Sequence, residues 1–196
     1  TTNTWSGCAG SRNYPLETLD EQYDVPVPGV MNASCPSEIA PLTNDRSTLD
    51  DQIDAMVATG DPYIPGGLIW GWRLLSKEAP YSEAKGYDER VQGQNVRKLL
   101  VLMSDGKNTL SPVYPAHTGN DAALADELTL EACSNIKARG ILIYSVAFQV
   151  DDEGARTVLQ KCASGPSKHF DADDERQLNI SLQEIARDFS PLRLTR

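Results

Sequence analysis

Two continuous apolar runs of strand length, separated by one helical segment, constrain the fold of this sequence more than any other feature. They are residues 97–104 (RKLLVLMS) and 141–149 (ILIYSVAFQ). Runs without polar alternation are typical of strands buried on both faces. Residues 122–139 between them have helical periodicity, and Gly140 is placed to end that helix. A strand, a helix and a second buried strand predict parallel pairing, because parallel strands need a long crossover connection.

Further helices flank these strands. The first has Leu49, Ile53, Met56 and Val57 on its apolar face, Ser47 or Thr48 as its cap, and Gly60 beyond its end. Other helices are predicted over residues 64–75, 154–162 and 175–189, with a short strand over 168–171. The alternation indicates an α/β protein with a Rossmann-like, doubly wound, mainly parallel sheet and helices on both faces.

The length of 196 residues suits one domain spanning residues 1–196. Within it we expect an irregular, disulfide-stapled segment over residues 1–45, which is rich in Pro, Gly, Asn and Ser, and regular elements over 46–196. The apolar fraction of 40% and charged fraction of 23% are those of a globular protein rather than a disordered one.

Four cysteines at wide spacing indicate two disulfides formed in an oxidising compartment. Three pairings are possible, and four buried thiols are the alternative. We favour Cys8 with Cys35 and Cys133 with Cys162, because each bridge then stays within one local region. Each would close a loop of about 30 residues and stabilise the fold by roughly 3–4 kcal/mol.

The formal net charge of −10 argues against nucleic acid or an anionic membrane surface as a partner. No apolar run approaches the roughly 20 residues that a membrane helix requires. Because the sequence begins at Thr1 without methionine, we expect a longer parent protein with its membrane anchor upstream.

Polar residues follow the first apolar run directly. Ligands of open parallel sheets gather at the carboxyl ends of the strands, so we expect a ligand-facing rim made by Ser104, Asp105, Gly106 and Asn108. The alternative is an Asp-Gly turn that only ends the strand. Trp70 and Trp72 are two residues apart on one predicted helix and cannot share a face. We expect one in the core, while the other is a candidate anchor for a partner, unless both pack internally.

The sequence gives little support for catalysis. It lacks the Gly-x-Ser-x-Gly nucleophile elbow and the Gly-rich phosphate loop. We interpret His117 and His169 as ordinary surface histidines, and the cysteine spacing does not indicate a zinc site. We therefore expect no enzyme and no required cofactor.

Several segments together resemble the von Willebrand factor A-type domain of TadG-like proteins, which belong to the Flp or tight-adherence pilus-assembly system. They are residues 5–8, 41–43, 63–73, 101–109, 133–141, 143–148, 162–164, 185–186 and 192–194. The resemblance implies the fold inferred above, with the first strand of the sheet missing from this chain. It also implies protein partners among pilus or envelope components.

A-type domains often bind a divalent cation through Asp-x-Ser-x-Ser, a Thr and a later Asp. The sequence matches only the last element, at Asp105, since Asp-x-Ser-x-Ser is absent and Pro62 occupies the Thr position. A site for Mg²⁺ or Ca²⁺ built on Asp105 with Asp61 is therefore the alternative to a domain without metal.

The resemblance implies a non-enzymatic interaction module for assembly or anchoring of adhesive pili, in the periplasm or outside the bacterial cell. Three alternatives remain open: a metal-ion-dependent adhesin that binds host or matrix ligands, a periplasmic enzyme, and a structural scaffold whose rim is vestigial.

Overall fold

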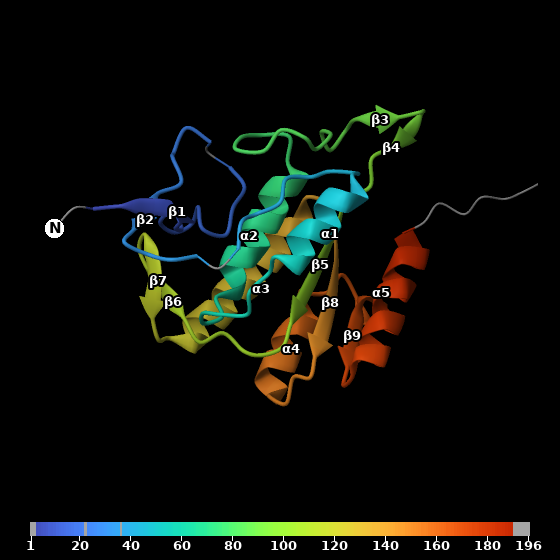
Figure 1. The fold of residues 1–196 in the computed structure, drawn as a ribbon. Coiled ribbons are helices and arrows are strands. Elements are labelled where there is room, and N and C mark those ends of the chain that lie inside the picture. The colour runs from blue at the N-terminus through green and yellow to red at the C-terminus, as the bar shows by residue number, and fades with distance from the viewer. Residues whose placement is uncertain (1–2, 22, 36, 190–196) are drawn as a thin grey trace, which may run out of the picture.

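The computed structural model describes residues 3–21, 23–35 and 37–189 (Figure 1). Its helices are α1 (Arg46–Asp54), α2 (Ile64–Leu75), α3 (Ala122–Ala138), α4 (Glu153–Cys162) and α5 (Glu175–Phe189), with a 3-10 turn at Pro166–Lys168. Its strands are β1 (Trp5–Ala9), β2 (Gly29–Met31), β3 (Arg90–Val91), β4 (Gln94–Asn95), β5 (Leu99–Ser104), β6 (Ser111–Val113), β7 (Ala116–Gly119), β8 (Leu142–Phe148) and β9 (His169–Ala172).

Three parallel strands form the central sheet, in the order β5-β8-β9. Leu99 pairs with Leu142 and Ser145 with His169, so the carboxyl ends of all three strands meet at one edge. The three arrows point the same way in Figure 1. The α/β class and the parallel sheet that the two apolar runs predict are thus confirmed.

Helices cover both faces of this sheet. Alternate residues of β8 point to opposite faces. Ile143 packs with α2 and α3 in one core, while Tyr144 packs against α5 in the other. The first core also contains Leu68 and Trp72, both 1% exposed, so the apolar face of α2 packs entirely within the protein.

The burial of β5 differs from the sequence prediction on one face of the strand. The pattern predicts a strand buried on both faces, which is wrong for Val101 (40% exposed) and Met103 (54% exposed). The reason is that β5 is the end strand of the sheet, while α5 packs mainly on β8 and β9, so the face that holds Val101 and Met103 is left open. Burial of both faces holds for the inner strand β8.

Helix α1 forms where expected, but its cap and packing differ. Its N-cap is Asp45, whose carboxylate accepts the N–H of Ser47, rather than Ser47 or Thr48. It ends at Asp54, well before Gly60, and buries no residue. The apolar positions Ile53, Met56 and Val57 are therefore exposed at 61%, 65% and 60%.

Both expected disulfides are present. The Cα atoms of Cys8 and Cys35 are 5.6 Å apart, and those of Cys133 and Cys162 are 5.2 Å apart. The first bridge ties the short β1–β2 pair to the irregular segment that follows it, and the second joins α3 to α4.

Two further antiparallel pairs, β3–β4 and β6–β7, lie outside the central sheet. Residues 192–194, which contribute to the family resemblance, lie outside the described residues. Across the described ranges, none of the helices is long and apolar enough to cross a bilayer.

Candidate functional site

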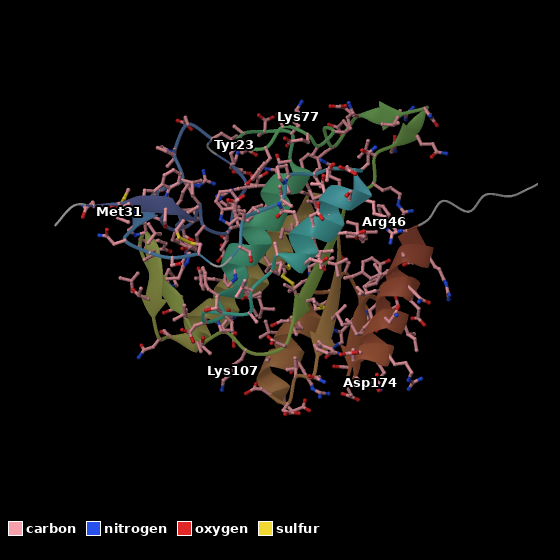
Figure 2. All side chains as sticks on the ribbon, viewed as in Figure 1. Tyr23, Met31, Arg46, Lys77, Lys107 and Asp174 are labelled. Atoms are coloured by element: carbon pink, nitrogen blue, oxygen red, sulfur yellow. A yellow bond between two sulfur atoms is a disulfide. The ribbon has the colours of Figure 1, made fainter. Side chains whose placement is uncertain are left out.

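Residues 104–108, at the end of β5 and in the loop that follows it, lie on the β5 side of the sheet's carboxyl edge, and we call them the rim loop. The hydroxyl of Ser104 donates to the carbonyl of Gly106 at 2.9 Å, which closes a tight turn. Asp105 at the turn is exposed, and its carboxylate makes no hydrogen bond or ion pair with a described residue. Lys107 reaches the carboxylate of Asp152 on the α4 side at 3.6 Å, and Figure 2 shows it at this edge.

Asn108, the fourth residue of the expected rim, faces inward. It is 1% exposed, and its amide donates to Asp126 at 2.8 Å and to Thr129 at 3.1 Å. Its carbonyl oxygen accepts the N–H of Ile64 at 2.8 Å. Asn108 therefore connects the rim loop to α2 and α3, which leaves Ser104, Asp105 and Gly106 as the outward part of the rim.

Asp61 lies on a loop that is bonded to the same region. The carbonyl of Pro62 accepts the N–H groups of Thr109 and Leu110, each at 3.1 Å. This pairing brings the 61–62 loop against the chain that leaves the rim loop, and Asp61 itself is exposed.

The donors do not form a divalent-cation site. In the described ranges, no three His, Cys, Asp or Glu side chains gather closely enough to hold a metal ion. Pro62 supplies only a carbonyl, which is already used by two backbone donors. A hard cation requires about six oxygen ligands. The residues present therefore do not fit the metal that A-type domains often carry.

The two tryptophans of α2 lie in different environments. Trp72 is 1% exposed, and its indole N–H donates to the hydroxyl of Tyr87 at 2.9 Å. Trp70 is half-buried, with its ring edge-on to Tyr81 and beneath the guanidinium of Arg73 at 4.6 Å. Only Trp70 is thus accessible enough to contact a partner, whereas Trp72 belongs to the core.

Both histidines are structural rather than ordinary surface residues, so the sequence interpretation is wrong for them. The ring of His169 is 8% exposed and bonds at 2.8 Å to Ser145, its cross-strand neighbour. His117 bonds to Ser11 at 2.7 Å and stacks on Tyr63, and burial lowers its pKa. Each ring has a polar partner within the fold, which a single sequence cannot reveal.

A Ser-His-Asp series at β8 and β9 has no catalytic geometry. Asp171 lies 3.6 Å from the other nitrogen of the His169 ring. However, Ser145 is 0% exposed in the middle of β8, so no substrate can reach its hydroxyl. Nucleophilic catalysis requires an accessible hydroxyl beside its base, and this series lacks one.

Charged residues of the irregular segment form a buried cluster that the sequence analysis did not single out. Arg12, Glu17, Asp20 and Arg73 are each 5% exposed or less. The guanidinium of Arg12 donates to the carbonyls of Glu21, Leu16 and Leu19, which wraps the segment around one side chain. The sequence indicates only one contact of this cluster. Trp70 and Arg73 are three residues apart on a predicted helix, and residues at this spacing are neighbours on the helix surface.

No protein-family model matches the sequence, and no curated protein matches it. Solved structures do share its fold. The vWF domain of the type V pili tip protein Mfa5 from Porphyromonas gingivalis matches at a TM-score of 0.55 and 13% identity, over 80% of this chain and 78% of that one. The pilus adhesin SpaC from Lactobacillus rhamnosus GG matches at a TM-score of 0.52 and 18% identity, over 74% of this chain.

This chain spans only 21% of the length of SpaC. A third structure, proximal thread matrix protein 1 from the mussel byssus with a zinc-occupied MIDAS motif, has a TM-score of 0.49 and 16% identity, over 74% of this chain and 31% of that one. For Mfa5 and SpaC, at 13% and 18% identity, the likeness establishes a shared fold alone, and this is the fold expected from the order of strands and helices.

Proposed function

We propose that this chain is a non-enzymatic protein-interaction module that acts in assembly or anchoring of adhesive pili of the Flp or tight-adherence type at the bacterial cell envelope. The observation that carries this proposal is the fold, which the chain shares with domains of two pilus proteins of distant sequence. The TadG-like sequence segments direct it toward the tight-adherence type. Its partners are pilus or envelope proteins.

Two disulfides support a site of action outside the cytoplasm, in the periplasm or at the cell surface. Cytosolic reductants keep most thiols reduced, so a domain with two disulfides belongs to an oxidising compartment. As part of this proposal, a membrane anchor precedes this chain in the parent protein.

The rim is the proposed contact surface for such a partner. Ser104, Asp105 and Gly106 stand at the carboxyl edge of the sheet, where open α/β sheets bind their ligands. Asp105 offers a carboxylate with no hydrogen-bond or ion-pair partner among the described residues, and Asp61 lies on the neighbouring loop. A basic partner group would complete a charge-assisted pair with either.

The absence of a fitting donor set favours direct protein contact over metal-mediated adhesion. An adhesin of the metal-dependent type requires a cation with an open coordination position, and Pro62 removes the expected hydroxyl. A scaffold with a vestigial rim differs from our proposal in one respect: its function would not depend on Asp105.

Gene deletion with complementation tests the proposal. We expect deletion in the source bacterium to remove surface pili and attachment to glass, and the intact gene to restore both. Complementation with Asp105→Ala should restore markedly fewer pili than Asp51→Ala, which removes an equally exposed carboxylate from α1. Normal pili after deletion would overturn the assembly role, while equal rescue by both variants would favour the scaffold.

A further inference from the structure

A cavity of about 340 Å³ lies between the β1–β2 pair, the segment 23–28 and one side of α2. Tyr23, labelled in Figure 2, is one of its lining residues. The volume falls at the lower end of the range of about 300–1,000 Å³ for small-molecule sites. Its walls are mostly apolar and include the aromatic rings and prolines of Trp5, Tyr23, Pro26, Pro28, Trp70 and Pro80.

The charges in this cavity have one sign. Among its described lining residues the charged ones are Arg12 and Arg73, and no carboxylate faces it. This contrasts with the chain as a whole, whose net charge is −10. A positive, apolar cavity in an acidic protein selects for a negative ligand group.

Arg73 is the group that lacks a partner. It is 4% exposed, and its guanidinium stacks on the ring of Trp70. It makes no hydrogen bond or ion pair with a described residue. Burial, together with the nearby charge of Arg12, lowers its pKa to about 10. Burying a guanidinium without hydrogen bonds is costly, and a carboxylate is the group that offsets this cost in bidentate geometry.

The nearest acidic group does not fill this role. Asp20 attracts Arg73 electrostatically, but it forms no ion pair with it. Asp20 lines a second, neighbouring cavity with Ser76 and Tyr87 and is not among the lining residues of this one. The donors of Arg73 are thus left for a ligand.

We propose that this cavity binds a carboxylate carried on a flat apolar body, with the carboxylate on Arg73 and the apolar body between Trp5 and Trp70. Two sources share this chemistry: a free aromatic acid, and an aromatic residue at the carboxyl terminus of a protein chain. The proposal is independent of the rim and of the pilus role.

The cavity wall is built with little freedom. The indole N–H of Trp5 donates to the carbonyl of Cys8 at 2.7 Å, and Cys8 is fixed by its disulfide to Cys35. A Cβ at Gly29 would lie 2.8 Å from the same indole nitrogen, so only glycine allows this position of the ring. Gly29→Ala therefore displaces the Trp5 wall without changing the charge of the site.

Calorimetric titration of the intact chain, with tryptophan fluorescence as a second readout, tests the proposal. The probes are phenylacetate as a free acid, N-acetyl-L-phenylalanine as a chain terminus, and phenylacetamide as the neutral control. We expect at least one acid to bind tenfold or more tightly than the amide. Phenylacetate alone would identify a free acid as the source, and N-acetyl-L-phenylalanine alone a chain terminus.

Variants locate the binding. Arg73→Gln should weaken acid binding at least tenfold, and Gly29→Ala should weaken acid and amide alike. Arg176→Gln removes an exposed arginine of α5 and should leave binding unchanged. If Arg73→Gln fails to fold, the comparison of acid with amide in the unaltered chain still shows whether the cavity selects a carboxylate. No binding of either acid at 10 mM, equal binding of acid and amide, or unchanged binding in a folded Arg73→Gln would overturn the proposal.

Discussion

The side-chain oxygen of Asn108 accepts the backbone N–H of Ile64 at 2.8 Å, so the loop that leaves β5 supplies the hydrogen bond at the start of α2. The N-cap residue of α2, Tyr63, makes no such side-chain bond. The first turn of a helix has N–H groups without intrahelical partners. A residue 44 positions along the chain here satisfies one of them.

We expect Asn108→Ala to lower the free energy of unfolding by about 2–3 kcal/mol, because the half-buried Asp126 and the buried Thr129 also lose a hydrogen bond. Urea denaturation followed by circular dichroism measures this. Asn179→Ala on the exposed side of α5 is the control and should change stability by no more than about 0.5 kcal/mol. Equal effects of the two substitutions would contradict the linking role.

Glu17 makes stability depend on pH in the neutral range. It is 3% exposed, and burial together with the neighbouring carboxylate of Glu131 raises its pKa to about 7, from an ordinary value of 4.5. The folded state thus holds this proton more tightly than the unfolded chain does. The stabilisation from Glu17 is complete below the unfolded pKa and is lost as pH rises through the folded pKa.

Denaturation midpoints of the unaltered chain and Glu17→Gln, measured between pH 4 and 8, test this. Glutamine cannot ionise, so the variant should gain stability relative to the unaltered chain as pH rises through this window. Glu127→Gln, at an exposed position of α3, should follow the unaltered chain. A constant difference between Glu17→Gln and the unaltered chain at every pH would show that Glu17 does not titrate in this range.

The side chains of Val101 and Met103 give β5 an exposed apolar face, which we expect to bind apolar dyes and promote self-association, because exposed apolar patches associate with other chains. We expect the double substitution Val101→Thr with Met103→Lys to reduce ANS fluorescence and association at high concentration. Unfolding free energy should change by less than about 1 kcal/mol.

Leu100 of the same strand is the matched comparison. It is 8% exposed within the core, so Leu100→Ala should cost about 2–4 kcal/mol. If the double variant at Val101 and Met103 were destabilised as strongly, that face of β5 would have to be covered in solution.

Metal addition should leave this chain unchanged. Asp105 and Asp61 are exposed carboxylates without a third acidic or histidine partner among the described residues, and Pro62 cannot contribute a hydroxyl. Calorimetric titration with Mg²⁺, Mn²⁺ and Ca²⁺ at millimolar concentration is expected to give no binding heat. Saturable heat that disappears in Asp105→Asn would revive the metal-dependent adhesin.

The sheet could be predicted because β8 and its flanking helices are specified locally. Few topologies are compatible with an unbroken apolar run that follows a helix ended by Gly140 after a short loop. The disulfide pairing could be predicted for a similar reason, because the two bridges join cysteines that are only 27 and 29 residues apart in the sequence. The exposure of Val101 could not be predicted. The apolar run over residues 97–104 is the same whether its second face is covered by other elements or left open.

The buried side chains of the irregular segment escaped prediction for a different reason. Arg12 and Glu17 carry charge, and residues of these types are rarely fully buried. Only the tertiary arrangement shows that Arg12 donates hydrogen bonds to backbone carbonyls. Similarly, the hydrogen bonds of Asn108 and His117 join segments that are 44 and 106 residues apart, beyond the reach of any local pattern.

The bridge between Cys133 and Cys162 also determines how the domain responds to pulling force. The 29-residue interval that it closes contains the whole of β8, the central strand of the sheet. With the bridge intact, a chain stretched from its two ends cannot draw this interval into extended form, which withholds roughly 100 Å of contour length. A pilus component built in this way would lengthen under tension only through its outer elements.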